Sequence, residues 1–496
     1  MSVTSSKIRF VCVLQLALLL SFETASAQDM SLPDVIQAAR ANSVQALRAR
    51  SAFVSDYWAW RSYLASRLPS LSLYGEVGGF DRSLRMLQDY QTGELNYVEN
   101  YNMQNSVGLR LSQNIFPTGG TFQLYSNLSR IDQFGKAGNL TWYAQPVTMS
   151  YTQPLFAYNS FKWSKKISPL EYENAKRNYL ENMEEVSLKA VDCYTELLCA
   201  QESYNASLSN FEDARTLLSV ARNRASLGTV SMDEVLQLEL GALNDSIAIN
   251  ENWVLLKKAQ MNLSSLLGTD SVSDVVVSLS DNLPDVNADY QMVLDKSFEN
   301  SSFRLSNEID AMNADAAVER AKADMGISMQ LNARFGLSQS AQDLSHTYAN
   351  LLDQEVVGLT FSVPIFDWGR GKGGVKKAQA AADVVKAQIR QAENDYTVSI
   401  FTAVSQFNNQ YNQCNVSRRA RDISANRYEL VREKFRSGTA SVTDLGNARS
   451  DRDNAQTRYV RDICNFWSYY YALRKLTLYD FESGADIDVD FDEMVE

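Results

Sequence analysis

The decapeptide VPIFDWGRGK occupies residues 363–372 and joins two kinds of sequence pattern. Before it, residues 356–363 alternate apolar and polar side chains, as a half-buried strand does. After it, residues 375–437 contain no proline and no glycine, which is typical of one long helix. The segment QPLFAYNSFK at residues 153–162 carries the same proline, phenylalanine and lysine 210 positions earlier. The sequence therefore makes one strand-to-helix corner twice.

A second pair of segments keeps the same offset. LGTVSMDEVL at 227–236 matches SGTASVTDLG at 437–446, again 210 positions apart. Gly228 and Gly438 are expected to end the two long helices in the left-handed conformation. Since two unrelated motifs keep one register, we interpret the chain as an internal two-fold repeat.

The helices expected from capping residues and from proline and glycine positions are long. The segment SPLE at 168–171 predicts a capping box with proline at the first helical position. Ser231 with Glu234, and Ser441 with an acid three residues later, predict two more. The expected helices cover residues 31–68, 168–227, 231–267, 289–325, 375–437 and 441–480.

Six shorter segments alternate apolar and polar residues, as strands with one apolar face do. They are residues 71–77, 107–112, 122–129, 147–152, 328–337 and 356–363. The 107–130 hairpin has no counterpart in the second half of the chain. It either extends the sheet, giving six strands, or decorates its outer face and leaves four.

The chain has 496 residues, a net charge of −12 and a mean hydropathy of −0.28. Residues 1–27 have a basic start, an apolar core and the final ASA of a secretory signal peptide, so the mature chain is expected to begin at Gln28. After residue 25 no apolar run reaches the ~20 residues of a membrane helix, which excludes a helical inner-membrane protein. The acidic balance argues against nucleic acid as a partner.

Candidate catalytic and metal-binding residues are few. His346 is the only histidine. The glycine-rich run GRGKGG at 369–374 lacks the Lys-Ser/Thr ending of a phosphate loop and is interpreted as a flexible joint. Four cysteines in helical patterns are expected to be small buried residues rather than a disulfide or metal site. They are Cys193, Cys199, Cys414 and Cys464. We therefore expect no enzyme, no metal and no cofactor.

Helices of about 90 Å cannot fold into a compact core and must pack beside long neighbours. The 375–437 helix has small and medium residues at spacings of three and four, as along a coiled-coil seam. The seam consists of Val375, Ala378, Ala382, Val385, Ile389, Ala392 and Tyr396. The strands are too few to close a membrane barrel, which takes about 8. An exported chain must therefore bury them in a soluble core or pool them with other copies.

With these features the chain resembles the TolC-type outer membrane factors of bacterial efflux and type I secretion systems. The segments that carry the resemblance are SLPDVIQAARAN at 31–42, SRLPSLSLYGEVG at 66–78, the QPLF and VPIF corners and the two GTxS hairpins. The resemblance implies a mainly α fold with a membrane β-barrel. In this fold a homotrimer pools its strands into one shared outer-membrane β-barrel, and its helices form a trimeric α-helical barrel tunnel through the periplasm.

The same resemblance implies a passive conduit with no cofactor, set in outer-membrane lipid. A periplasmic adaptor (membrane fusion protein) and an inner-membrane pump of RND or ABC type would dock at the helical tip. The adaptor-docking residues would be Gly228, Thr229 and Val230 in the first copy and Gly438, Thr439 and Ala440 in the second.

The resemblance also implies a periplasmic gate of acidic residues at the tips, at Glu234 and Asp444. Acids at these positions serve as helix N-cap partners in any case, so gate and cap both stay open as interpretations. A second acidic ring is not expected, because Gln237 and Asn447 occupy its positions.

The expected organisation is a signal peptide over 1–27, a first repeat over 28–268, a linker over 269–288, a second repeat over 289–479 and an acidic tail over 480–496. The tail has eight acidic and no basic residues and is expected to be solvated or loosely draped. The alternative function is a soluble periplasmic coiled-coil scaffold. That alternative explains the helices but not alternating strands that end at aromatic-flanked prolines.

Overall fold

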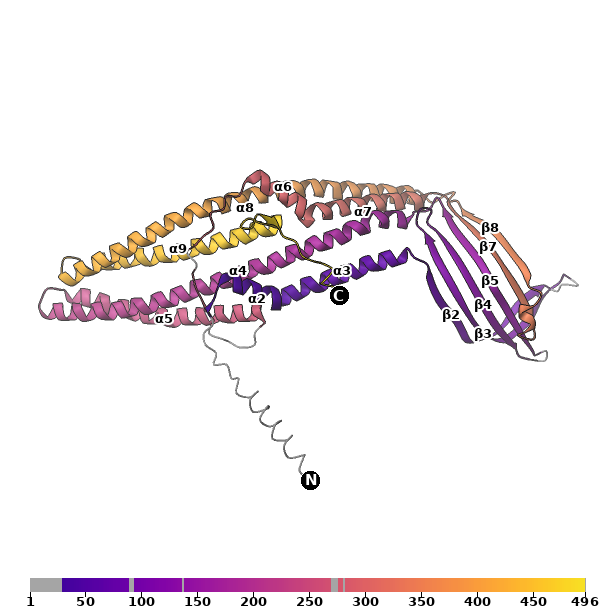
Figure 1. Cartoon of the computed structure of the whole chain (residues 1–496), viewed down its shortest axis with the longest axis horizontal. Coiled ribbons are helices and arrows are strands. Elements are labelled where there is room, and N and C mark those ends of the chain that lie inside the picture. Colours follow the sequence, from indigo (N-terminus) through magenta and orange to yellow (C-terminus); the bar gives the residue numbers. More distant parts are fainter. Residues whose placement is uncertain (1–28, 89–92, 136–137, 269–274, 280–281, 496) are drawn as a thin grey trace, which may run out of the picture.

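The chain forms a long rod with a twisted sheet at one end and the turns of two helical hairpins at the other (Figure 1). The computed structural model describes residues 29–88, 93–135, 138–268, 275–279 and 282–495. The expected signal peptide at 1–27 lies outside the described residues, as do parts of the expected linker.

Two long helices run the length of the rod. They are α4 (Ser160–Ser226) with 67 residues and α8 (Arg370–Ser437) with 68, about 100 Å each at the helical rise. Each turns back as a helix of 36 residues, α5 (Met232–Leu267) or α9 (Val442–Thr477). None of the helices in the described ranges combines the length and apolarity that crossing a bilayer requires.

Both long helices begin earlier than their sequences predict. α4 starts at an N-cap formed by Asn159, whose side chain accepts the Lys162 N–H at 3.2 Å, so the expected start at Ser168 is wrong. Pro169 lies inside the helix, where it removes one backbone donor and its ring crowds the carbonyl four residues earlier. Contacts of the extra turns hold them helical, among them Phe161 against Phe116 at 4.7 Å.

The glycine-rich run is also helical, which corrects its interpretation as a flexible joint. The carboxylate of Asp367 accepts the N–H groups of Gly369 at 2.9 Å and Gly371 at 2.7 Å. The first backbone donors of α8 are thus satisfied by a side chain of the protein itself, where a phosphate loop would bind an anion.

The remaining helices are shorter than predicted, because each expected single helix is split by a serine. α2 (Leu32–Asn42) and α3 (Val44–Ser66) meet at Ser43, and α6 (Tyr290–Asn300) and α7 (Ser302–Met325) meet at Ser301. Both serines are extended, and Ser43 Oγ accepts the Ala46 N–H at 3.1 Å. A serine side chain that caps the next helix competes with continuation of the first one.

The sheet contains six antiparallel strands in the order β2-β3-β4-β5-β7-β8. Their bounds are Ser70–Gln88, Leu95–Ile115, Gly120–Gln133, Asn139–Leu155, Ser328–Ala341 and Leu352–Ser362. The 107–130 hairpin lies within β3 and β4, in the middle of this sheet. Of the two expectations for that hairpin, the structure therefore shows the six-stranded one.

Neighbouring helices pack along the predicted seam. All seven seam residues of α8 are buried or half-buried, and α8 packs against α7. The four cysteines of the described residues are free, and Cys199 Sγ lies 3.9 Å from Cys464 Sγ. The expectation of buried small residues is confirmed for three of them, whereas Cys199 is half-buried.

Two connecting segments are more ordered than expected. Within the linker, β6 (Val276–Val277) pairs in parallel with β1 (Asp29–Met30) beside α4. The acidic tail is not loosely draped. After the short pair β9 (Tyr479–Asp480) and β10 (Ala485–Asp486), Phe491 packs on Phe53 of α3 with ring centroids 5.0 Å apart. Apolar residues between the tail acids make this contact, because they alternate with the charges.

Candidate functional site

The two hairpin tips have nearly the same backbone geometry. Gly228 and Gly438 have φ values of 73° and 88°, in the left-handed region expected for helix stops. The threonine after each glycine closes the turn. Thr229 donates both its N–H and its hydroxyl to the Arg224 carbonyl, each at 3.0 Å. Thr439 does the same to the Lys434 carbonyl, at 2.8 and 3.2 Å. Both threonines are exposed, whereas the next residue of each tip is half-buried.

The two predicted gate carboxylates form complete capping boxes. Ser231 Oγ accepts the Glu234 N–H at 3.2 Å, and the Glu234 carboxylate accepts the Ser231 N–H at 3.1 Å. Ser441 and Asp444 repeat this exchange at 3.1 and 3.2 Å. Hydrogen bonds from the side chain and backbone of Ser441 hold the pKa of Asp444 below its ordinary value. Both acids are therefore occupied as helix caps at the tip.

The two tips differ in one contact. Arg224, at the end of α4, reaches across to the second hairpin and donates to the Phe435 carbonyl at 2.7 Å. Its guanidinium would lie 2.8 Å from a Cβ added at Gly438. A Cβ added at Gly228 would meet no atom within 4 Å. The second tip is therefore contacted by a side chain of the first hairpin, whereas a side chain at Gly228 would meet open space.

A network of charged and hydrogen-bonding side chains, which sequence reasoning missed, ties the two hairpins together behind the tips. We call it the interhairpin network. Its residues are Asn210 and Asp213 of α4, Asp245 of α5, Tyr428 and Arg432 of α8, and Arg449, Arg452 and Asp453 of α9. Asp213 lies 15 residues before the first tip glycine, about 22 Å along the helix.

Asp213 is the centre of this network. Its carboxylate accepts the Tyr428 hydroxyl at 3.1 Å and lies 3.6 Å from Arg432 and 3.9 Å from Arg452. The Arg452 guanidinium also stacks 4.1 Å above the Tyr428 ring. Asn210 donates to Asp453 at 2.9 Å. The sequence held a signal for this network, because its polar side chains interrupt the apolar faces by which the helices pack.

A second group of charged residues joins the helices near the middle of the rod, around a fully buried carboxylate. Glu184 of α4 is 0% exposed and pairs with Arg40 of α2 and Arg474 of α9. Arg474 also contacts Asp480 of the tail at 3.1 Å. Helices far apart in the sequence are thus joined by one buried charge cluster.

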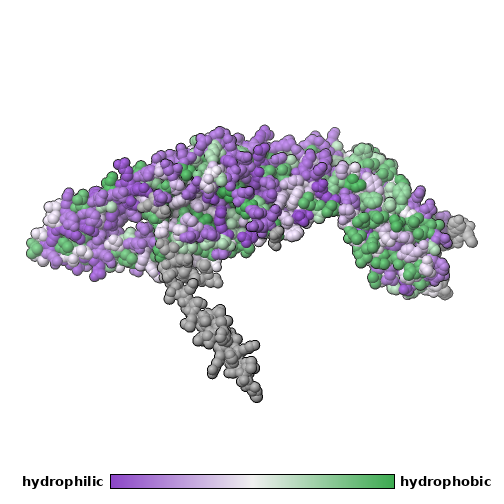
Figure 2. All heavy atoms as spheres, viewed as in Figure 1, coloured by the Kyte–Doolittle hydropathy of each residue, from purple (hydrophilic) through white to green (hydrophobic). Residues whose placement is uncertain are grey.

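At the other end of the rod, one sheet face is mostly apolar, although Glu355 of β8 lies on it opposite Phe335. The registers align Leu71, Leu111, Leu124, Met149 and Phe335 in a single row. A neighbouring row aligns Phe122, Tyr151, Ala333 and Val357. The predicted alternation is therefore confirmed. Figure 2 shows hydrophobic residues gathered over the sheet, while the helical part is mostly hydrophilic.

The apolar side chains of this face are exposed. Leu71 is 70% and Phe361 67% exposed, although both are among the most apolar residues of the chain. The opposite face carries polar residues, such as Ser72 paired with Arg110. A largely apolar exposed surface backed by a polar one matches a strand layer between lipid and water.

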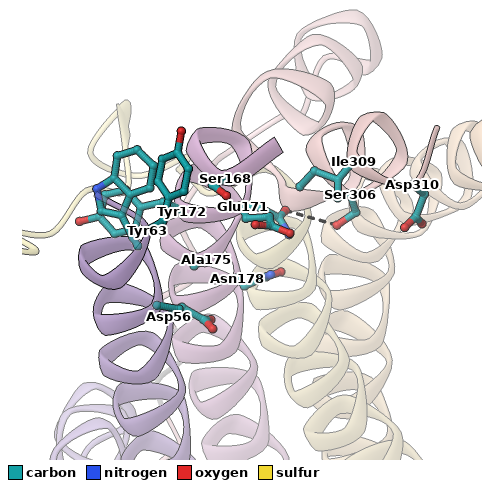
Figure 3. Close-up of a pocket in the computed structure, with 13 residues that line it drawn as sticks. Asp56, Tyr63, Ser168, Glu171, Tyr172, Ala175, Asn178, Ser306, Ile309 and Asp310 are labelled. Atoms are coloured by element: carbon teal, nitrogen blue, oxygen red, sulfur yellow. Dashed lines mark hydrogen bonds between the residues drawn. The ribbon is translucent and has the colours of Figure 1, made fainter. Parts of the chain in front are cut away.

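Between the sheet and mid-length, a pocket of about 560 Å³ opens where α3 and α7 flank α4 (Figure 3). Carboxylates of Asp56, Glu171 and Asp310 line it, with no lysine or arginine. Burial raises the pKa of Asp56 above its ordinary value. In the part of the chain that the structure describes, no three His, Cys, Asp or Glu side chains are grouped to hold a metal ion. The pocket therefore presents negative charge on the helix wall.

Comparison with known proteins agrees with this architecture. Residues 305–476 match the family model described as outer membrane efflux protein. No curated protein matches the chain. Among solved structures, CmeC of Campylobacter jejuni, an outer membrane channel, is 15% identical with a TM-score of 0.65, over 96% of this chain and 94% of that one. The outer membrane protein VceC of Vibrio cholerae is 15% identical with a TM-score of 0.63, over 92% and 97%.

The open state of the MtrE outer membrane channel of Neisseria gonorrhoeae is 13% identical with a TM-score of 0.59, over 92% of this chain and 93% of that one. Identities this low establish a shared fold. The family matched by residues 305–476 consists of transport conduits rather than enzymes. Residues 305–476 therefore match the outer membrane efflux protein family, and the chain as a whole shares the fold of these outer membrane channels.

Proposed function

We propose that the chain is the outer-membrane exit duct of a tripartite efflux or type I secretion system. The observation that carries this proposal is the exposed apolar face of the six-stranded sheet, at one end of helices about 100 Å long. Such a face is stable in the hydrocarbon of a bilayer, with the polar face turned to water. The helices then extend from the outer membrane into the periplasm.

The functional unit is a homotrimer. An open sheet cannot lie in lipid with unpaired edges, because the backbone groups there would have no hydrogen-bond partner. Three copies solve this by sharing one outer-membrane β-barrel, with their helices side by side as one tunnel. The two halves of each chain, residues 28–268 and 289–479, act as tandem repeats that contribute equivalent hairpins to the tunnel wall.

The hairpin tips are the docking points for a periplasmic adaptor and, through it, an inner-membrane pump of RND or ABC type. Gly228 and Thr229, like Gly438 and Thr439, are exposed in a repeated turn geometry. Val230 and Ala440 are half-buried and pack beneath these turns. Two equivalent turns per chain would offer a trimer six similar contacts.

Opening of the entrance requires the two hairpins of each chain to move apart. The interhairpin network opposes this motion, since it joins α4 and α5 to α8 and α9. Glu234 and Asp444 add negative charge at the narrow end, which favours cations. The duct does no chemistry; adaptor and pump binding supply the free energy that separates the hairpins.

The test is expression of the full chain, with its leader, in a Gram-negative host. We expect the protein in the outer-membrane fraction, extraction only with detergent, a trimer by native mass spectrometry, and channels in planar lipid bilayers. A monomer that is soluble in buffer without detergent would overturn the proposal in favour of a periplasmic scaffold. For docking, Gly438→Val is expected to weaken in-cell cross-linking to the adaptor and to leave the trimer intact.

A further inference from the structure

The two edges of the sheet are open and similar in character. Within the described residues, β2 pairs only with β3, and β8 only with β7. Both edge strands expose large apolar side chains on the same face, including Leu73 of β2 at 73% and Leu359 of β8 at 51%. Long apolar edges of this kind lead to aggregation unless another strand covers them.

Resting on the proposed outer-membrane duct, we propose that β8 of one copy pairs with β2 of the next, so that three copies of six strands close an 18-stranded barrel. The occupant of each open edge is therefore a second copy of this chain. The middle hairpin, β3 and β4, is a part of the barrel wall.

Strand direction permits this closure. All neighbours in the sheet are antiparallel, and the number of strands per chain is even. β8 therefore runs opposite to the β2 of a neighbouring copy, and the alternation continues around the ring. With an odd number of strands, each junction between copies would be parallel.

Side-chain parity fixes which residues share a face at the junction. β2 begins at Ser70 and β8 ends at Ser362, both where a helix joins the sheet. Pairing odd-numbered residues of β8 with odd-numbered residues of β2 places Phe361 and Leu359 on the same face as Leu71 and Leu73. A slip of one residue would turn the apolar set of one copy toward water.

The width of the helical wall matches the width of a sheet with six strands per chain, and not the width of a sheet with four. The helices α3, α4, α7 and α8 pack side by side in that order, and their ends meet the sheet (Figure 1). Four helices about 9 Å apart form a wall about 36 Å wide. Six strands about 4.8 Å apart, tilted by about 40°, span about 38 Å, whereas four strands span about 25 Å. Six strands per chain thus match the arc of the helical wall.

This closure has a consequence for transport. Barrel diameter grows roughly linearly with strand number, so 18 strands make an exit about one and a half times as wide as 12 strands do. Barrels of about 18 strands leave an aqueous channel. The helical tips, and not the barrel, then limit the size of the cargo.

The test is a cysteine pair across the proposed junction. Ser72→Cys and Thr360→Cys lie on the polar face of the two edge strands, in exposed positions. In intact outer membranes, mild oxidation should convert the double variant into disulfide-linked dimers and trimers on a non-reducing denaturing gel. The matched control, Ser72→Cys with Leu359→Cys, places the thiols on opposite faces and should stay monomeric on the gel. The unaltered chain gives the baseline of its native cysteines.

A cryo-EM map of the unaltered trimer in detergent provides a second readout that needs no substitution. Eighteen strands with β3 and β4 in the wall are expected. Trimers with 12 strands and the β3–β4 hairpin outside the wall, or with no cross-link from the polar-face pair, would overturn the 18-stranded barrel and leave the duct standing. Failure to associate with membranes at all would overturn the duct and the barrel together.

Discussion

The hydroxyl of Tyr428 in the second hairpin donates a hydrogen bond to the carboxylate of Asp213 in the first, at 3.1 Å. Tyr428 is only 1% exposed, and two arginines flank the same carboxylate. This contact joins the two hairpins close to their tips, at the end of the rod where an entrance must open.

Removal of this link should favour the open entrance. Tyr428→Phe deletes one hydrogen bond to a charged group, worth about 1.5–3 kcal/mol, and about 1.4 kcal/mol already shifts an equilibrium tenfold. Asp213→Asn removes the charge that the arginines face. Each variant is expected to raise single-channel conductance in planar bilayers. Asp451→Asn is the control, because Asp451 pairs with Arg427 inside one hairpin, where both are exposed. An equal increase in conductance in the control would contradict the proposal that the interhairpin network keeps the entrance closed.

The same hydrogen bond predicts a response to alkaline pH. Burial, and then the charge of Asp213, raise the pKa of Tyr428 to about 12. Because the neutral phenol is favoured in the folded state, its stabilisation is complete below the ordinary pKa of 10 and is lost as pH rises through about 12. The tyrosinate absorbance of the protein minus that of Tyr428→Phe should show one late titration. A difference curve centred near pH 10 would contradict the buried contact.

The gate and cap interpretations of the tip acids can be separated. Glu234→Gln with Asp444→Asn retains side-chain acceptors for the capping boxes but removes charge. A gate predicts higher conductance and weaker preference for cations over anions in bilayers. Asp233→Asn, which changes a neighbouring exposed acid at the first tip, serves as the control. Conductance and ion preference equal to those of the unaltered trimer would leave the two acids as caps alone.

The asymmetry between the tips predicts unequal effects of the same substitution. Valine at either glycine must adopt a left-handed conformation, which costs about 1–3 kcal/mol. Gly438→Val must also displace the Arg224 guanidinium, whereas Gly228→Val meets open space. Hydrogen exchange of the tip amides, followed by mass spectrometry, should therefore rise more in Gly438→Val, and on both hairpins. Equal effects confined to the substituted turn would argue against the Arg224 contact.

The buried carboxylate at mid-length should dominate stability. Glu184→Leu leaves two arginines without their shared partner, and breaking a buried pair in this way costs about 3–5 kcal/mol. Its neighbour Glu185 pairs with Lys475 at the surface, where such pairs contribute about 0–1 kcal/mol. Denaturant midpoints in detergent should thus fall strongly for Glu184→Leu and little for Glu185→Leu. Similar denaturant midpoints for the two variants would show that the buried charge cluster around Glu184 does not stabilise the fold.

Local sequence chemistry determined the helix stops, the caps and the strand faces. Gly228, Gly438 and the two tip boxes, Ser231 with Glu234 and Ser441 with Asp444, act within a few residues of themselves, so their outcome did not depend on distant contacts. The alternation of the strands likewise assigned each side chain to a face, because the period of a strand is two residues.

Local signals failed where a distant or competing partner decided the outcome. Pro169 predicts a helix start, yet contacts of Phe161 and the Asn159 cap extend α4 toward its N-terminus beyond this proline. The charges of the tail predict a solvated segment, yet Phe491 packs against Phe53, which lies more than four hundred residues earlier in the chain.

The sequence by itself determined a rod with two glycine-capped hairpins and strands of one apolar face, because periodicity and capping are properties of short segments. Only the tertiary structure decided that the 107–130 hairpin joins the sheet, that the sheet has six strands, and that Asp213, Tyr428 and Arg452 meet between the hairpins. These depend on which strands and helices become neighbours, and neighbours are chosen by packing between segments far apart in the chain.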